Sequence, residues 1–505
     1  MSESYATLRS RLRELAALNS ALNLLGWDQE TMMPPAAAGT RAEELSLLSR
    51  MAHERATSNE LGDLLGDCEG DKTLEADTTI AANLREIRRD YDRARKLPSD
   101  FVAEFSETTS HALEAWKSAR SASDFPRFCP WLEKIVDLSR RKADYVGIAE
   151  GGEAYDTLLD EFEPGMTAAA VEGIFGPLRD ELRPLIEAIA EAPQLDDASN
   201  RVEVPIPTQQ DFHREVLGRI GFDLQAGRLD TSTHPFSSGV APGDTRITSR
   251  YTPDGMAEAL GSTMHEAGHG MYEQGLPKQE HWGEPLGESL GLGIHESQSR
   301  LWENQVGRSR EFWSWIRPLL LDATGDAFAG YDVDALYRAA NVVRPNLIRV
   351  ESDEATYNLH IMLRFDLERA MLTGDLPAAD LPDAWNERIR KDLGLDVPDA
   401  ARGCLQDIHW SMGAIGYFPT YTLGTLYSAQ FWDAIAADLP DLAGSIERGE
   451  FGDLLDWLRD RIHRRGRELP ARELCIELTG RPLDHRPLIT YLNGKLGEIY
   501  GLSPR

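Results

Sequence analysis

The amino-acid sequence predicts a mainly α-helical protein with a small β-sheet in its middle. Residues 1–198 are rich in Leu, Ala, Glu and Arg, with apolar side chains spaced three and four positions apart. Residues 199–251 instead contain short extended pieces separated by Gly, Ser and Pro. Helical patterns return in residues 252–505. Because no repeat and no low-complexity linker divides these three parts, we expect the 505 residues to form one unit.

The N-terminal part is predicted to be a helical bundle. Its breaks are short, at 66–70, 98–100 and 121–124, and a turn is expected from Leu25 to the Pro34-Pro35 pair. The helices are predicted over 5–25, 40–56, 74–96, 101–118, 125–149 and 168–190.

Composition excludes several classes of function. The net charge of −31 is unsuited to nucleic acid or anionic membranes, since both require basic surfaces. No run of 18 apolar residues is present, and the acidic start of the chain does not resemble a secretory signal. We therefore expect a cytoplasmic protein with reduced thiols. Its widely spaced cysteines are Cys68, Cys129, Cys404 and Cys475.

Two strands are predicted just before the longest motif of the sequence. They cover 231–236 and 245–251, around a turn at Pro242-Gly243-Asp244. An edge strand in this position could hold an extended peptide by main-chain hydrogen bonds. An ordinary surface hairpin would give the same pattern.

His265-Glu266-Ala267-Gly268-His269 has the form H-E-x-x-H within a predicted helix that runs to Gly275, with Asp254 as its N-cap. On a helix the two histidines project from one face and can bind one Zn²⁺. Glu266 can reach a water beside the metal without being a ligand, which suits a general base. The alternative is a helix with two buried histidines and a solvated glutamate.

A third metal ligand is expected from the helical pattern over 287–304. Glu296 is favoured because His295, Ser297 and Gln298 beside it could orient the metal ligands. Spacing alone leaves the alternatives Glu284, Glu288 and Glu303 open. Two histidines and one carboxylate would leave a fourth position for water, the pattern of a catalytic site.

Several motifs together resemble the carboxypeptidase Taq family of metallocarboxypeptidases, and the resemblance runs essentially from end to end. One departure is Ser352, where the family pattern I-R-x-x-A-D has Ala. Besides the H-E-x-x-H stretch, the motifs are residues 27–31 (WDQET), 234–236 (HPF), 244–248 (DTRIT), 295–298 (HESQ), 348–353 (IRVESD) and 403–410 (GCLQDIHW).

The resemblance implies a two-lobed helical fold with a deep groove, similar to angiotensin-converting enzyme and neurolysin. It implies His265, His269 and Glu296 as ligands of one divalent metal per chain, Zn²⁺ or Co²⁺, with Glu266 as general base and acid. It also implies broad removal of single C-terminal residues from peptides with a free carboxylate, and a homodimer.

An oxyanion formed during peptide hydrolysis needs a hydrogen-bond donor besides the metal. Related helical metallopeptidases have a histidine and tyrosines in the C-terminal third, so His409 and Tyr421 are expected in this role, with Tyr417 near the substrate. The alternative is that this aromatic run only packs the core.

Recognition of a terminal carboxylate requires a cation, and a guanidinium binds it through two hydrogen bonds. We expect Arg349 in this role, with Arg246 and His234 in supporting contacts to the substrate. The alternative for Arg349 is a salt bridge with the nearby Glu351 or Asp353.

Two other functions fit parts of the sequence. An oligopeptidase or dipeptidyl carboxypeptidase would share the metal chemistry, but Arg349 and the 406–410 motif favour single-residue removal. An aminopeptidase would carry a G-x-M-E-N stretch, which is absent from the sequence. A non-catalytic acidic binding protein would have no need for the intact set His265, Glu266, His269 and Glu296.

Overall fold

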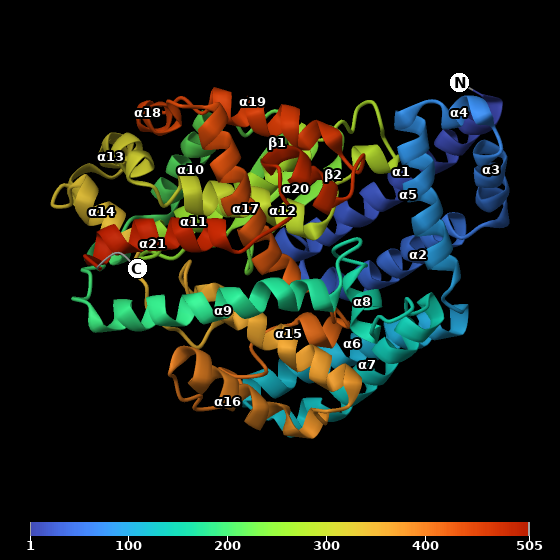
Figure 1. The fold of residues 1–505 in the computed structure, drawn as a ribbon, viewed down its shortest axis with the longest axis horizontal. Helices are drawn as coiled ribbons and strands as arrows, with labels where there is room; N and C mark the ends of the chain where they lie inside the picture. The colour runs from blue at the N-terminus through green and yellow to red at the C-terminus, as the bar shows by residue number, and fades with distance from the viewer. Residues whose placement is uncertain (1, 503–505) are drawn as a thin grey trace.

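The structure, a computed structural model, describes residues 2–502 and is built almost entirely of helices (Figure 1). Ser2, Ser58, Asp77 and Thr167 cap helices with their side chains, as their residue types favour. The helices before the sheet are α1 (Glu3–Thr31), α2 (Ala38–Ala56), α3 (Asn59–Glu69), α4 (Lys72–Glu75), α5 (Thr78–Arg95), α6 (Ser99–Ala122), α7 (Phe125–Val146), α8 (Ala154–Leu159), α9 (Ala168–Glu191) and α10 (Ile206–Ile220).

The helices after the sheet include a wide π-helical turn, Leu301–Val306, that directly continues α12. The α-helices of this part are α11 (Met256–Gly275), α12 (Leu292–Arg300), α13 (Arg310–Thr324), α14 (Val333–Ala340), α15 (Tyr357–Thr373), α16 (Leu381–Leu393), α17 (Pro419–Asp438), α18 (Leu442–Arg448), α19 (Gly452–Arg461), α20 (Ala471–Thr479) and α21 (Arg486–Tyr500).

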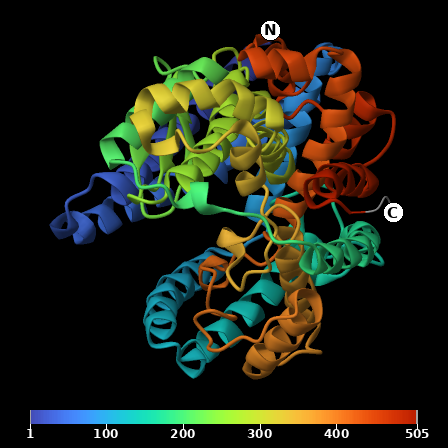
Figure 2. The ribbon, with the colours of Figure 1, turned by 90° about the vertical axis from the view of Figure 1, so that its left-hand side faces the viewer.

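The molecule has two lobes (Figure 2). One lobe contains α6, α7, α15 and α16, which pack together although they come from distant parts of the sequence. The other contains the sheet, α10–α14 and α17–α21, with α1–α5 at one end. Helix α9 contacts both α15 and α21 and so links the lobes. One continuous buried cluster includes residues from Ala112 to Tyr500.

Two predicted breaks in the N-terminal part are wrong. Helix α1 continues through Trp27 to Thr31, where a turn was expected, because the buried Trp27 side chain packs beneath Arg246 of the sheet. Helix α3 covers 66–69 despite Gly66. A helical glycine costs about 1 kcal/mol relative to alanine, and burial of Leu65 and Cys68 offsets that cost.

The sheet has three strands, β1 (Gly227–Thr231), β2 (Ser237–Ala241) and β3 (Asp244–Ser249), in the order β1-β3-β2. Strand β3 is parallel to β1 and antiparallel to β2. The predicted turn at 242–244 joins β2 and β3, but the predicted strand over 231–236 is wrong. Residues 232–236 form the connection between β1 and β2, where Pro235 offers no N–H to a ladder.

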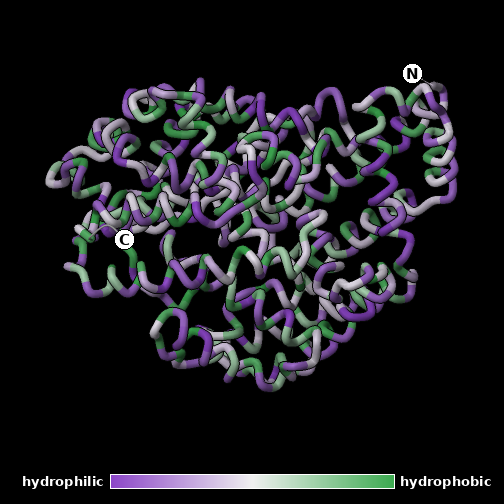
Figure 3. Tube along the Cα trace, in the orientation of Figure 1, coloured by the Kyte–Doolittle hydropathy of each residue, from purple (hydrophilic) through white to green (hydrophobic). Residues whose placement is uncertain are grey.

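Helix α11 lies against β3 and α12 and ends at Gly275, as predicted. Asp254 is not its N-cap: Gly255 holds that position, and Oδ1 of Asp254 accepts a hydrogen bond from the Thr252 hydroxyl. Hydrophilic and hydrophobic residues alternate along the helices (Figure 3). Within residues 2–502, none of the helices has both the length and the apolar content needed to cross a membrane.

Candidate active site

Helices α11 and α12 bring His265, His269 and Glu296 together. Their ligand atoms all lie within 4.8 Å of one another. Oε2 of Glu296 is 3.4 Å from Nε2 of His269 and 3.8 Å from Nε2 of His265. Metal bonds of about 2.0–2.1 Å in tetrahedral geometry place neighbouring ligand atoms about 3.3–3.5 Å apart. The three side chains therefore fit a divalent metal with only small adjustments.

Two glycines allow the backbones around this cluster to approach closely. A Cβ atom at Gly268 of α11 would collide with the carbonyl oxygen of Gln298 and lie 2.6 Å from Cα of Ser299, both in α12. A Cβ atom at Gly424 of α17 would lie 2.5 Å from Cβ of Glu296. Any other residue at either position would displace Glu296 or its helix.

The other glutamates considered as the third ligand have different neighbours. Glu284 accepts a hydrogen bond from the Tyr5 hydroxyl at 2.5 Å and forms an ion pair with Arg9. Glu288 is not in the cluster of three. Glu303 lies behind the cluster, where its Oε2 is 2.9 Å from Nδ1 of His265. Its position in the π-helical turn is notable because such turns are frequent at functional sites.

Arg300 holds the two carboxylates of this region. Its Nε donates to Oε1 of Glu296 at 2.7 Å, and its Nη1 donates to Oε2 of Glu303 at 2.9 Å. Burial alone would raise the pKa of Glu296, but Arg300 and His265 lower it to about 2. The Arg300 guanidinium also lies over the Tyr357 ring, 4.3 Å from its centre. Glu296 is therefore ionised and fixed in orientation.

Glu266 is buried beside the cluster and is only 6% exposed. Its Oε2 has no hydrogen-bond partner among the described residues. Burial raises the pKa of this carboxyl group to about 7. An unpartnered carboxylate with a raised pKa next to two histidines is an arrangement that suits a general base.

His409, Tyr417 and Tyr421 form one group, with His409 in the 3₁₀ turn His409–Met412, Tyr417 just before α17 and Tyr421 in its first turn. Nε2 of His409 is 3.1 Å from the Tyr421 hydroxyl, and the ring centres of His409 and Tyr417 are 5.2 Å apart. Burial lowers the pKa of His409 to about 3 and raises that of Tyr421 well above its usual value. At neutral pH both groups are uncharged and can donate hydrogen bonds.

Arg349 is buried and its guanidinium pairs with Asp407, so the alternative of a salt bridge with Glu351 or Asp353 is wrong. Its Nη2 and Nε lie 2.8 and 3.0 Å from Oδ1 of Asp407. Its Nη1 donates to the Tyr357 hydroxyl at 2.8 Å. Nε of the buried Arg364 donates to the second oxygen of Asp407 at 2.7 Å. Two guanidinium groups thus share one carboxylate.

A family model described as Carboxypeptidase Taq (M32) metallopeptidase matches residues 7–496. The chain belongs to this family. Thermostable carboxypeptidase 1 of Thermus thermophilus is 41% identical over 507 residues, covering 99% of both chains. Thermostable carboxypeptidase 1 of Pyrococcus furiosus is 38% identical, covering 98% of both. The crystal structure of an M32 carboxypeptidase from Deinococcus radiodurans R1 has a TM-score of 0.96 at 40% identity, covering 99% of this chain and 100% of that one.

Membership of the carboxypeptidase Taq family makes the protein a metallocarboxypeptidase that uses a divalent metal. It also confirms the resemblance and the mainly helical fold with a small sheet that the sequence predicted.

The contacts described for Arg246 and His234 are with residues outside the metal cluster of this carboxypeptidase. Arg246 of β3 forms a bidentate ion pair with Asp244, in which its Nε and Nη2 donate to the two carboxylate oxygens at 2.8 and 2.9 Å. Its guanidinium also lies over the Trp27 ring. His234 is exposed in the connection between β1 and β2. Partial burial and the charges of Arg120 and Arg250 lower its pKa. The structure describes no direct contact between either residue and the H-E-x-x-H histidines.

Sequence reasoning missed four residues around the site of this family member: Arg300, Tyr357, Arg364 and Asp407. The i, i+4 spacing of Glu296 and Arg300 on a helix could have indicated their pairing. Arg364 and Tyr357 gave no comparable signal, since both reach the site through the fold of α15.

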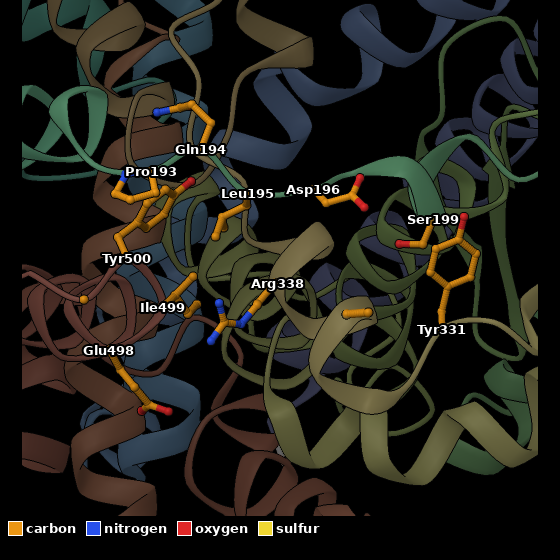
Figure 4. A pocket seen from close by; sticks show the side chains of 12 residues that line it. Pro193, Gln194, Leu195, Asp196, Ser199, Tyr331, Arg338, Glu498, Ile499 and Tyr500 are labelled. Carbon is orange, nitrogen blue, oxygen red and sulfur yellow. The ribbon is translucent and has the colours of Figure 1, made fainter.

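A cavity of about 540 Å³ lies elsewhere, between the 193–199 connection, α14 and the end of α21 (Figure 4). Arg338, Glu498 and Tyr500 are among its lining residues. None of the predicted site residues lines it, so it takes no part in the proposal for catalysis.

Proposed function

We propose that the protein removes single C-terminal residues from peptides with a free carboxylate, with broad specificity. The observation that carries this proposal is the position of the His265–His269–Glu296 cluster beside the unpartnered oxygen of Glu266. The sharing of Asp407 between Arg349 and Arg364 supports an enzyme that binds a terminal carboxylate over an oligopeptidase, and a dipeptidyl carboxypeptidase remains the alternative that the product analysis below tests.

One divalent metal per chain binds to His265, His269 and Glu296. Two imidazoles and one carboxylate suit Zn²⁺, with Co²⁺ as the second choice. When bound, this metal supplies Lewis acidity that lowers the pKa of water to about 7 and polarises the scissile carbonyl.

Glu266 takes the proton of the attacking water and returns it to the leaving amine. The Tyr421 hydroxyl donates a hydrogen bond to the developing oxyanion, and His409 orients that hydroxyl through the 3.1 Å contact. Arg300 keeps Glu296 ionised and in place through the second oxygen of that carboxylate. Glu266 and Glu296 are buried, and Arg300, His409 and Tyr421 are only partly exposed, so solvent weakens their interactions less than it would at the surface.

Arg349 binds the terminal carboxylate of the substrate. One buried carboxylate, Asp407, faces two guanidinium groups, which leaves one positive charge unbalanced. A peptide carboxylate would supply the missing negative charge. Tyr417, Arg246 and His234 make supporting contacts to the peptide as it lies between the two lobes.

The protein works in the cytoplasm as a homodimer. Cys68, Cys129, Cys404 and Cys475 are all free thiols, and three of them are buried, which fits a reducing compartment. The dimer rests on the resemblance to the family alone.

Mass spectrometry of a peptide incubated with the protein and Zn²⁺ tests the reaction. We expect a ladder of products that shorten by one residue at a time from the C-terminus, and no products after exhaustive chelation. Removal of dipeptides, or cleavage inside the peptide, would contradict the proposal and favour the alternative. A full-length peptide under all metal conditions would contradict peptidase activity altogether.

The raised pKa of Glu266 predicts the pH dependence of the reaction. A base acts only when ionised, so activity must fall as the pH drops through its pKa. That pKa is about 7 without metal, and the charge of a bound cation shifts it lower. We expect kcat/KM to be level near pH 8 and to fall about tenfold per pH unit on an acidic limb below 7. A rate that rises as the pH falls would contradict Glu266 as the base.

A further inference from the structure

His269 contacts a third imidazole ring, that of His295. Nδ1 of His269 lies 2.6 Å from Nδ1 of His295 and 3.1 Å from the carbonyl oxygen of the same residue. On the far side of the ring, Nε2 of His295 lies 2.8 Å from Oε1 of Glu273. The three side chains form a continuous chain that leads away from the metal cluster, and all three are largely buried.

The positions of the hydrogens in this chain follow from the carboxylate of Glu273 at its end. An ionised carboxylate can only accept, so Nε2 of His295 donates to Glu273, and when that ring carries one hydrogen its Nδ1 has a lone pair. Two nitrogens 2.6 Å apart need one proton between them, so Nδ1 of His269 must donate it. The lone pair of His269 is then on Nε2, the nitrogen that faces Glu296 at 3.4 Å. This tautomer is the one that can bind a metal.

Two further residues hold Glu273 in place. Nζ of Lys278, which is 7% exposed, forms an ion pair with its second oxygen and balances its charge. Gly239 of β2 covers the same oxygen, because a Cβ atom there would collide with Oε2 of Glu273 and lie 2.6 Å from Nζ of Lys278. The sheet therefore leaves room for the carboxylate only because residue 239 has no side chain.

The two histidines of H-E-x-x-H thus differ in the groups that contact their Nδ1 atoms. Nδ1 of His265 meets a carboxylate directly, at 2.9 Å from Glu303. His269 reaches a carboxylate only through the ring of His295, and the backbone carbonyl oxygen of residue 295, at 3.1 Å, is a second and neutral acceptor for the same Nδ1.

We propose that His295, held by Glu273, is a positioning residue that fixes His269 in the tautomer that binds the metal. This inference rests on the proposed role of His269 as a ligand. It gives His295 a role of its own beside Glu296, and it makes Lys278 and Gly239 parts of the same support.

Zinc affinity, measured by competition with a chromophoric chelator, tests the role of His295. We expect His295→Phe, which keeps a ring but makes no hydrogen bonds, to weaken Zn²⁺ binding about 10–100-fold. In His295→Gln, the amide oxygen can accept from His269 while the amide nitrogen donates to Glu273. We expect its affinity to lie within about threefold of the wild type. Equal losses in both variants would overturn the proposal, as would wild-type affinity in His295→Phe.

A second pair of variants tests the same chain without altering any of its members. Gly239→Ala should push Glu273 and Lys278 aside and weaken Zn²⁺ binding by a similar factor. Gly261→Ala, on the same helix as His269, meets no atom within 4 Å and should leave the affinity unchanged. If thermal unfolding of the metal-free form shows that His295→Phe does not fold, the comparison of Gly239→Ala with Gly261→Ala tests the positioning role instead. Unchanged affinity in Gly239→Ala would then overturn the proposal.

The same titrations separate this inference from the proposed function. Wild-type protein that binds one Zn²⁺ while His295→Phe and Gly239→Ala bind it equally well would overturn the positioning role alone. Wild-type protein that binds no Zn²⁺ would overturn the metal site and the positioning role together.

Discussion

Glu266→Gln should lower kcat by about 10²–10⁴-fold while the protein keeps its full complement of metal. The amide has nearly the same size as the carboxylate but cannot take a proton from water. His265, His269 and Glu296 are untouched, so the ion should stay bound. Steady-state kinetics and elemental analysis of the same preparation measure both quantities.

Thermal unfolding supplies the control for this variant. The pKa of Glu266 is about 7 in the folded protein and near 4.5 in an unfolded chain, so its ionisation opposes folding above pH 7 and not below 4.5. Metal-free Glu266→Gln should therefore be more stable than the metal-free wild type at pH 8. Loss of metal in the variant would instead identify Glu266 as a ligand, and an unchanged rate would place the base elsewhere.

Arg349→Ala should lower kcat/KM for peptides with a free C-terminal carboxylate by about 30-fold to several thousandfold. Removing one partner of a buried charged contact costs about 2–5 kcal/mol, at 1.4 kcal/mol per factor of ten. Amidation of the peptide C-terminus should lower kcat/KM of the wild-type enzyme by about the same factor, because the substrate then lacks its negative charge. In Arg349→Ala the same amidation should lower kcat/KM little further, since the guanidinium that would pair with the substrate carboxylate is already missing.

The double comparison distinguishes recognition from damage to the fold. Arg349 also pairs with Asp407, so its removal disturbs the protein as well as the substrate contact. Damage of that kind would lower kcat/KM equally for the peptide with a free carboxylate and for the peptide amide. If Arg349→Ala still strongly prefers the free acid, the carboxylate is bound elsewhere, and Arg246 becomes the next residue to replace.

Local sequence patterns predicted most of the helices, including the one that carries the H-E-x-x-H motif, because a helix depends on spacing along the chain. Spacing could not choose among Glu284, Glu288, Glu296 and Glu303, since their order along the chain does not say which faces α11. That choice depends on how closely α11, α12 and α17 pack at Gly268 and Gly424.

The remaining differences have the same origin. The strand expected over 231–236 was misplaced because Pro235 interrupts a segment whose residue types favour strands, whereas the strand expected over 245–251 corresponds to β3. The pairing of Arg349 with Asp407 joins residues 58 positions apart, and the approach of Tyr357 and Arg364 depends on the whole of α15. Such contacts arise from tertiary packing and have no local signature.

The hydrogen bond between His409 and Tyr421 joins the two lobes. His409 belongs to a short 3₁₀ turn, His409–Met412, that packs on α6 and α7, whereas Tyr421 begins α17, which packs on α12. A hinge-bending motion that parted the lobes would carry His409 away from Glu296 and leave His265, His269 and Glu296 together on α11 and α12. Metal binding and efficient cleavage would then be separable: an opened molecule would keep its metal but lose the contact that orients the Tyr421 hydroxyl, and closure around a peptide would restore that contact.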